Sequence, residues 1–197
     1  MKKIILASTS KYRKELLERL GIDFECMNPN VDEEIHKKNI SDPLELAETL
    51  GRLKAEAVYE RYPDALVIGS DQLAECNGTR LSKPKTMEKA VEQLIFLNNK
   101  EHRLITSYTV IFNGKSTTKT NITTLRMRKL SEPQIKYYLR KDIPFDCAGS
   151  YKLELNGISL FANIETSDQT AIIGLPLISL ANTLNELGVM VPPENSH

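Results

Sequence analysis

The stretch IILASTSKYRKELLERLG, residues 4–21, predicts the strand–turn–helix unit from which the fold can be worked out. Its apolar start predicts a short buried strand, and the polar residues that follow predict a tight turn. The remainder predicts an amphipathic helix, because Tyr12, Leu16 and Leu20 fall on one helix face and Gly21 can end it. This order of elements is typical of α/β proteins.

The predicted helix begins with Lys11, Arg13 and Lys14, at the unfavourable end of a helix for positive charge. A helix N-terminus behaves like about half a positive charge. One interpretation is that the three side chains are solvated, at a cost of roughly a few tenths of a kcal/mol each. The other is that an anion binds at the turn, where backbone N–H groups and the hydroxyls of Ser8 and Ser10 would face it. Arg13 could then contact a phosphate through two N–H groups.

The composition limits the class of protein. The chain has 197 residues, 41% of them apolar, which suffices for one large domain or two closely packed lobes. Its 26 Lys and Arg residues balance 26 Asp and Glu residues, which argues against a general binder of nucleic acid polymers. Three widely spaced cysteines without metal-ligand spacing are typical of a reducing compartment. No apolar run approaches the roughly 18 residues of a membrane-spanning helix. We therefore expect a soluble cytoplasmic protein without membrane contact.

Helices and strands alternate irregularly along the rest of the chain. Helices are expected over residues 43–62, 86–98, from 131 onward and over 176–187. Strands are expected over 65–69, through hairpin turns at Asn77-Gly78 and Asn113-Gly114, over 103–128, within 145–161, and as a last buried strand over 171–176. The expected class is α/β with a mixed sheet. The sequence contains neither GxGxxG nor GxxxxGK[ST], so dinucleotide and P-loop sites lose their main support.

Asp71 follows the apolar run LVIGS at the end of the first of these buried strands. It either caps the transition from strand to hairpin or points into a cleft as a metal ligand or general base. Lys83 lies on the returning strand of the predicted hairpin. An ideal two-residue turn would pair Lys83 with Gln72 and place Asp71 on the opposite face, whereas a bulge would reverse this. The register leaves open whether Asp71 and Lys83 meet.

Glu33 and Lys54 are two further candidates. Glu33, in the segment VDEE, is either part of a solvated acidic loop or, with Asp71, an oxygen ligand for Mg²⁺. That ion commonly takes one or two carboxylates together with substrate phosphates. Lys54 shares a predicted helix face with Ala47 and Gly51. Its ammonium group either snorkels to the surface or reaches a phosphate.

Seven segments, taken in order, resemble a known family. They are LASTSKYRKELL at 6–17, Asp32–Glu33, LGRLKA at 50–55, IGSDQ at 68–72, Lys83–Pro84, CAGSYKLE at 147–154 and IIGLP at 172–176. Each is weak evidence alone, but together they resemble the signature of the Maf family over about residues 4–187. Maf proteins are nucleotide pyrophosphatases, which hydrolyse nucleoside triphosphates to monophosphates and pyrophosphate.

The resemblance implies a fold of the Maf and ITPase-like kind. This is an elongated mixed sheet flanked by helices, with two lobes and an active-site cleft between them. It implies a single domain over residues 1–190 and a C-terminal tail over 191–197. Because the family often forms homodimers, a homodimer is also an expectation.

The resemblance also implies roles for individual residues. The residues expected to bind the triphosphate are Ser8, Ser10, Arg13, Lys54 and Lys83. A divalent cation, Mg²⁺ or Mn²⁺, is expected to bind Glu33 and Asp71. Asp71 is the expected catalytic residue, which orients or deprotonates the water that attacks the α-phosphorus. Whether it acts as base, as metal ligand or as both stays open.

The details most resemble the subfamily that hydrolyses 7-methyl-GTP. The residues expected to set specificity are Tyr12, Gln72 and Glu154. N7-methylation makes the guanine ring positive, and a cation over the face of Tyr12 gains about 0.5–2 kcal/mol. Glu154 could accept the N–H edge of the base. From the residues alone, Tyr12 could equally be a core residue and Glu154 a charge on a strand surface. Tyr12 stands where Trp is commoner, and Lys11 stands where Pro is usual.

Two other functions stay open at this point. The protein could belong to the dTTP/UTP or broad-range branch, and preference for those triphosphates would overturn the roles of Gln72 and Glu154. It could also be a non-catalytic nucleotide-binding regulator of septum formation, because Maf proteins are linked to septum arrest. The presence of Arg13, Asp71 and both lysines argues for an enzyme.

Overall fold

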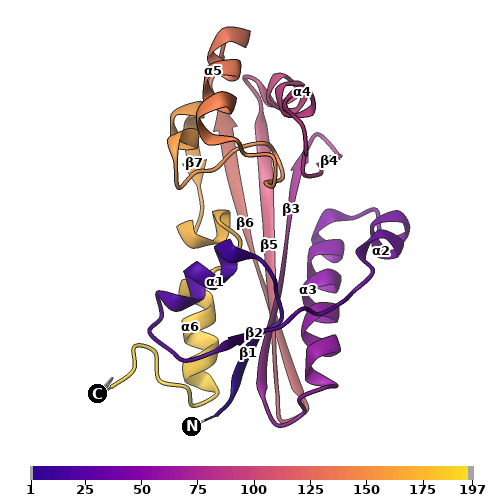
Figure 1. Cartoon of the computed structure of the whole chain (residues 1–197), viewed down its shortest axis with the longest axis vertical. Helices are drawn as coiled ribbons and strands as arrows, with labels where there is room; N and C mark the ends of the chain where they lie inside the picture. Colours follow the sequence, from indigo (N-terminus) through magenta and orange to yellow (C-terminus); the bar gives the residue numbers. More distant parts are fainter. Residues whose placement is uncertain (1, 195–197) are drawn as a thin grey trace. The chain divides into compact units, whose positions relative to one another are not determined.

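The computed structural model describes residues 2–194, and Figure 1 shows the course of the chain. The elements in chain order are β1 (Ile4–Leu6), α1 (Lys11–Glu18), β2 (Glu25–Cys26), α2 (Glu33–Asn39), α3 (Pro43–Tyr59), β3 (Leu66–Cys76), β4 (Thr79–Leu81), α4 (Met87–Leu97), β5 (Glu101–Phe112), β6 (Lys115–Met127), α5 (Glu132–Asp142), the 3₁₀ helix η1 (Asn156–Leu160), β7 (Phe161–Glu165), the 3₁₀ helix η2 (Gln169–Ile172) and α6 (Leu177–Glu186). The expected α/β class is confirmed.

The strands form one mixed sheet with the order β2-β1-β3-β5-β6-β7, and β4 also pairs with β3. β1 runs parallel to both β2 and β3. β4 is antiparallel to β3, and β7 is antiparallel to β6. The predicted turn at Asn77-Gly78 is confirmed, because Cys76 pairs with Thr79 across it and both turn residues have positive φ, as a type I′ turn requires.

The chain divides into two compact units. The first contains the residues up to Gln72, Thr106–Asn121 and the residues from Asp168 onward; the second contains Leu73–Ile105 and Ile122–Ser167. The long strands β3, β5 and β6 contribute to both units, because the boundaries fall within them. The predicted cleft and the single domain over 1–190 stay predictions, as does the tail over 191–197, of which 195–197 lie outside the described residues.

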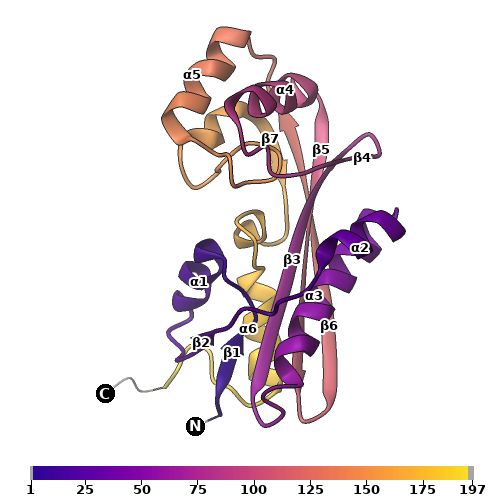
Figure 2. The ribbon, with the colours of Figure 1, turned by 45° about the vertical axis from the view of Figure 1, so that its right-hand side comes forward.

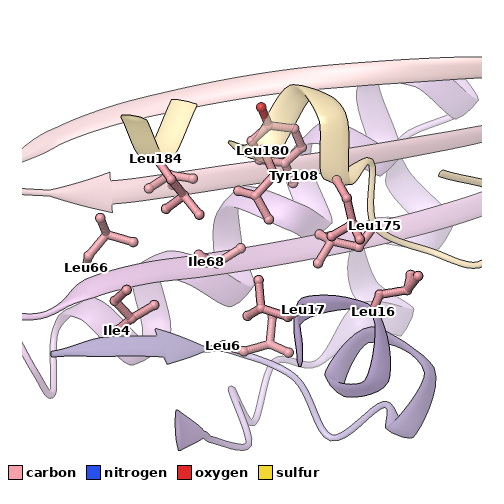
Figure 3. Packing of buried hydrophobic residues seen from close by; sticks show 12 residues of the cluster. Ile4, Leu6, Leu16, Leu17, Leu66, Ile68, Tyr108, Leu175, Leu180 and Leu184 are labelled. Carbon is pink, nitrogen blue, oxygen red and sulfur yellow. The ribbon is translucent and has the colours of Figure 1, made fainter. Parts of the chain in front are cut away.

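Two apolar cores cover the two faces of the sheet in the first unit. Side chains alternate along β1, so Ile4 and Leu6 join one core while Ile5 and Ala7 join the other. The first core includes residues of α1 and α6, and Figure 3 shows them converging on β1, β3 and β5. The second core packs under α3. Accordingly α1 and α6 lie on one face of these strands and α3 on the other (Figure 2).

The second unit is organised around α4, α5 and a buried aromatic cluster. α4 packs on α5, and α5 on η1. The ring of Tyr151 meets those of His102 and Phe161 edge-on or nearly so, and His102 Nε2 lies 2.9 Å from the Tyr151 hydroxyl. Arg103 donates two hydrogen bonds to Glu75, whose other oxygen accepts from Gly78 N at the hairpin turn.

Three expectations about local structure are wrong. The segment around Glu33, expected as an acidic loop, forms helix α2, because Asp32 accepts a hydrogen bond from Glu34 N as an N-cap. The strand expected over 171–176 is the 3₁₀ helix η2 followed by a turn; a short apolar run cannot distinguish a strand from another buried segment. Glu154, expected on a strand, lies in an exposed turn before η1.

No helix within residues 2–194 combines the length and the apolar character that crossing a bilayer requires.

Candidate active site

A buried lysine between two carboxylates forms the centre of the candidate site. Lys54 Nζ on α3 lies 2.6 Å from Asp71 Oδ1 on β3 and 2.7 Å from Glu33 Oε1 at the start of α2. The Lys54 and Asp71 side chains are only 8% and 10% exposed, and Glu33 is 32% exposed. The structure therefore brings Glu33 and Asp71 together, as the metal-site hypothesis expected, and places Lys54 between them, which the sequence did not predict. The interpretation of Lys54 as a snorkelling side chain is wrong.

Glycines allow α3 to approach β3 closely enough for this contact. Gly69 faces α3, and a Cβ atom at this position would lie closer than 3.0 Å to Gly51 O and Ala55 N. Those atoms are backbone and cannot move aside without shifting the helix. Lys54 extends from the same helix to Asp71, two residues beyond Gly69 on the same face of β3. The absence of a side chain at Gly69 thus positions the lysine.

Electrostatics fix Glu33 in its charged form. Burial raises the pKa of Glu33, but the charge of Lys54 and hydrogen bonds from Lys37 and Lys54 outweigh burial, and the pKa falls to about 2. Lys37 Nζ lies 2.8 Å from Glu33 Oε2, so each oxygen of Glu33 faces a different lysine. Burial lowers the pKa of Lys37, but its bonds to Glu33 and Glu34 more than compensate and the pKa rises. This chain of ion pairs ties α2 to α3.

One oxygen of Asp71 stays available for chemistry. Among the described residues, only His102 Nδ1 and Asp142 Oδ2 are buried side-chain polar atoms that lack a hydrogen-bond partner. Asp71 Oδ1 accepts from Lys54, whereas Asp71 Oδ2 accepts from no described residue and is not one of those two atoms. Asp71 Oδ2 therefore keeps some solvent-accessible area, although the Asp71 side chain is only 10% exposed. A carboxylate oxygen in this setting can accept a proton, orient a water molecule or bind a cation.

The three cations predicted at the start of α1 are confirmed in place. The helix begins at Lys11, Ser10 is its N-cap, and the first turn has no acidic residue. Ser10 Oγ lies 3.5 Å from Arg13 N, and Ser8 Oγ accepts from Ser10 N at 3.1 Å. Ser8 is buried and Ser10 is half-buried. The turn thus places two hydroxyls and a helix N-terminus together, which is an arrangement that suits an anion.

Arg13 is held in a fixed position that leaves its outer nitrogens available. Arg13 Nε donates to Gly174 O at 3.0 Å, and this carbonyl also accepts from Ser70 Oγ. The backbone at Gly174 has φ 129°, which side-chain-bearing residues rarely adopt. Arg13 Nη1 and Nη2 donate to no described residue, and the Arg13 side chain is half-buried. Burial lowers the Arg13 pKa, and the negative charges of Asp71 and Glu33 oppose that change.

Gln72 and Tyr12 also belong to the first unit. The Gln72 amide donates to Thr106 Oγ1, Ala171 O and Ile172 O at 2.8–3.0 Å. Tyr12 is half-buried and is not a member of the apolar core that contains Leu16 and Leu17, so its interpretation as a core residue is not supported. The Lys11 ammonium lies 4.9 Å from the centre of the Tyr12 ring, which shows that this face can accept a cation.

Lys83 and Glu154 belong to the second unit. β4 ends at Leu81, so the pairing of Lys83 with Gln72 that an ideal hairpin would give does not form. Lys83 and Glu154 are both exposed, Lys83 after β4 and Glu154 in its turn before η1. Their predicted roles as phosphate and base ligands stay predictions.

Lys37, Thr106 and Gly174 are site residues that the sequence interpretation missed. Lys37 could have been found from its spacing of four residues from Glu33, had the helix been recognised. Thr106 looked like an ordinary strand residue, and Gly174 acts through its carbonyl oxygen, which no side-chain pattern reveals.

Comparisons with known proteins show which family this chain resembles. The family described as Maf-like protein matches residues 3–187. The 7-methyl-GTP pyrophosphatase of Bdellovibrio bacteriovorus is 47% identical over 183 residues, covering 93% of this chain and 96% of the relative. Those of Pseudomonas syringae pv. tomato and Xanthomonas axonopodis pv. citri are each 41% identical, covering 98% of this chain and 100% of the relative.

A HAM1 protein from Coxiella burnetii aligns with 94% of this chain and 100% of its own, with a TM-score of 0.46 and 11% identity, a likeness too weak to support a conclusion. The family match spans nearly the whole chain, and the relatives are similar over their full lengths. The chain belongs to the Maf family.

Proposed function

We propose that this protein hydrolyses 7-methyl-GTP to 7-methyl-GMP and pyrophosphate. The observation that carries the proposal is the combination of a cationic helix start with a carboxylate, Asp71, that keeps one oxygen free of protein partners. The first can hold a polyphosphate, and the second can handle the water that cleaves it. The relatives reported above are named for this reaction.

The triphosphate is proposed to bind at the turn before α1. The hydroxyls of Ser8 and Ser10 and the outer nitrogens of Arg13 supply the donors, and Lys54 adds positive charge. Lys83 is proposed as a further phosphate ligand. An arginine whose Nε is already fixed loses little conformational freedom when its other nitrogens bind a phosphate in a bidentate manner.

Asp71 is proposed to direct the attacking water. Lys54 holds Asp71 Oδ1, so the second oxygen can accept a proton from the water or orient it toward the α-phosphorus. The Lys54 and Arg13 charges favour the negative charge that develops on the phosphate, so most of the catalysis would come from positioning and charge neutralisation. Pyrophosphate is the leaving group.

A divalent cation, Mg²⁺ or Mn²⁺, is proposed to bind Asp71 and Glu33. The donors fit, because both are carboxylates that meet at Lys54 Nζ and Asp71 Oδ2 has no other partner among the described residues. Residues 2–194 contain no cluster of three or more such ligands, which is in keeping with an ion that takes its remaining ligands from phosphates and water. When bound, the ion would neutralise phosphate charge. Glu33 would have to share an oxygen now facing a lysine.

The base is proposed to be recognised by Tyr12, Gln72 and Glu154. A positively charged 7-methylguanine would gain from the Tyr12 face and from the negative charge of Glu154. The cytoplasmic location and a homodimer remain further predictions.

The decisive test is pyrophosphate release across 7-methyl-GTP, GTP, dTTP, UTP and ATP, each with and without Mg²⁺. We expect the highest kcat/KM for 7-methyl-GTP and loss of activity with a chelator. Preference for dTTP or UTP would assign the protein to the other branch. Tight nucleotide binding without pyrophosphate release would instead favour a regulator of septum formation, although the presence of Arg13, Lys54 and Asp71 argues against that alternative.

A further inference from the structure

We propose that Thr106 is a positioning residue that fixes the amide of Gln72 with its oxygen outward, so that the site selects bases whose edge presents N–H donors. The inference rests on the proposed function, because it takes Gln72 to face the base. It adds a residue outside the seven segments that identified the family, and it specifies the chemistry that Gln72 can recognise.

The Gln72 amide nitrogen is fully occupied by the protein. Gln72 Nε2 lies 2.8 Å from Ala171 O, 2.9 Å from Thr106 Oγ1 and 3.0 Å from Ile172 O. Two of these acceptors are backbone carbonyls of η2, which have no proton to donate. The two N–H groups of the Gln72 amide are therefore shared among three acceptor oxygens.

The Thr106 hydroxyl acts as a hydrogen-bond acceptor toward Gln72. Thr106 Oγ1 lies 2.9 Å from Ala171 O, which can only accept, so the hydroxyl proton points to that carbonyl. Thr106 Oγ1 then faces Gln72 as an acceptor. A flipped amide would place the Gln72 oxygen against the carbonyl oxygens of Ala171 and Ile172, which have no proton to donate. The contacts therefore favour one amide orientation, and Thr106 is the side chain that completes it.

The Gln72 oxygen faces outward as a consequence. Gln72 Oε1 accepts no hydrogen bond from residues 2–194, and it is not one of the two buried polar atoms that lack a partner. It therefore keeps some solvent-accessible area, and Gln72 as a whole is half-buried. Thr106 is 1% exposed, so it cannot itself contact a large ligand.

An outward carbonyl oxygen can only accept hydrogen bonds. The base edge that it meets must supply an N–H group. Guanine supplies two adjacent donors, the ring N1–H and the exocyclic amine, and methylation at N7 leaves both in place. Adenine and cytosine have an acceptor at the corresponding ring nitrogen, which would face Gln72 Oε1 oxygen to nitrogen without a proton. The inferred preference is for a base that offers N–H donors on this edge: guanine offers two, whereas uracil and thymine offer only the ring N3–H.

The test compares substrates within each variant, so that the fraction of folded enzyme cancels. The substrates are 7-methyl-GTP, 7-methyl-ITP, which lacks the exocyclic amine, and 1,7-dimethyl-GTP, which lacks N1–H. In the wild type we expect at least one analogue to lose about 10-fold in kcat/KM, the size of one hydrogen bond to a ligand. Thr106→Val should abolish most of that discrimination, chiefly through KM, and Thr106→Ser should retain it.

Gln72→Leu supplies the second arm of the test. If Thr106 acts only through Gln72, then Thr106→Val adds no further loss of discrimination in the Gln72→Leu background. Discrimination that survives in Thr106→Val but disappears in Gln72→Leu would overturn the inference, and so would full additivity of the two changes. Thr106→Ala replaces Thr106→Val if the latter fails to fold. Failure of the wild type to hydrolyse 7-methyl-GTP at all would instead refute the proposed function.

Discussion

Lys54 has two carboxylate partners, and this determines what each residue of the cluster contributes to stability. Its ammonium is 8% exposed and contacts both Asp71 and Glu33. Removing the only partner of a buried charge typically costs about 3–5 kcal/mol. Here the loss of one carboxylate leaves the other in place, whereas the loss of Lys54 leaves two like charges side by side. Stability should therefore depend more on the lysine than on either carboxylate.

Asp71→Asn separates catalysis from folding. Asparagine still offers an oxygen to Lys54 Nζ, but the outward atom is no longer a carboxylate, so it cannot accept a proton from water. We expect kcat for 7-methyl-GTP to fall by about 10²–10⁴-fold and the thermal midpoint to change little. Steady-state kinetics and calorimetry would measure the two effects. Asp64→Asn, at an exposed position, is the control. Hydrolysis at nearly wild-type rate in Asp71→Asn would remove this residue from the mechanism.

At the scale of elements, the contact of α3 with β3 can be tested with two glycines that differ in available space. A Cβ at Gly69 would collide with the backbone of Gly51 and Ala55, whereas a Cβ at Gly51 would lie 3.5 Å from its nearest neighbours. We expect Gly69→Ala to lower the free energy of unfolding by roughly 1–3 kcal/mol and to reduce activity, because α3 carries Lys54. Gly51→Ala should be tolerated and could gain up to about 1 kcal/mol from helix propensity. Urea unfolding measures the change in the free energy of unfolding for both variants. Equal changes would contradict the prediction that only Gly69 needs to lack a side chain.

Helix α2 gives a second prediction at this scale. Lys37 holds Glu33 Oε2, so Lys37→Met should free Glu33 to turn away from Lys54. We expect kcat/KM to fall by about 2- to 10-fold, the value of one hydrogen bond, and Lys37→Arg to restore most of it. Lys38→Met, an exposed neighbour on the same helix, is the control. Equal activity of the Lys37 and Lys38 variants would show that Glu33 needs no support from α2.

The elements that the sequence predicted well are those with strong local signals. Capped helices such as α3, with Asp42 and Pro43 at its start, and the two Asn-Gly turns were found because a few adjacent residues determine them. The apolar run over 171–176 was misread because its burial comes from tertiary contacts. The ion pairs of Lys54 join three separate elements, so no local pattern could predict them.

At the scale of the whole molecule, each compact unit contains a titratable group whose pKa is strongly lowered by folding, His102 in the second unit and Glu33 in the first. In the second unit, burial lowers the pKa of His102 from 6.5 to about 4, although the negative charge of Glu75 opposes this. In the first unit the pKa of Glu33 falls from 4.5 to about 2, because Lys54 and Lys37 outweigh burial. Both groups bind protons more weakly in the folded state, so both make stability fall as the pH is lowered, but in different ranges.

The folded and unfolded pKa values of each group determine the pH range over which its contribution to stability is lost. For His102 the unfolded chain binds a proton first, so the stability present above pH 6.5 is lost as the pH falls toward 4. That loss is about 3 kcal/mol, at roughly 1.4 kcal/mol per pH unit. For Glu33 the stability is present above pH 4.5 and is lost as the pH falls toward 2. The free energy of unfolding should therefore fall in two successive steps as the pH is lowered.

Urea unfolding at pH 7, 5, 4 and 3 would resolve these steps. We expect His102→Gln to flatten the dependence between pH 7 and 4. Glu33→Gln should reduce the dependence below pH 4.5, where Glu75, whose pKa is also lowered, contributes the remainder. Each change should leave the other step in place because His102 and Glu33 belong to different units. His36→Gln and the exposed Glu60→Gln are the matched controls and should leave both steps unchanged. If His102→Gln keeps the upper step, then protonation of another group causes it, and the burial of His102 in the aromatic cluster does not govern acid stability.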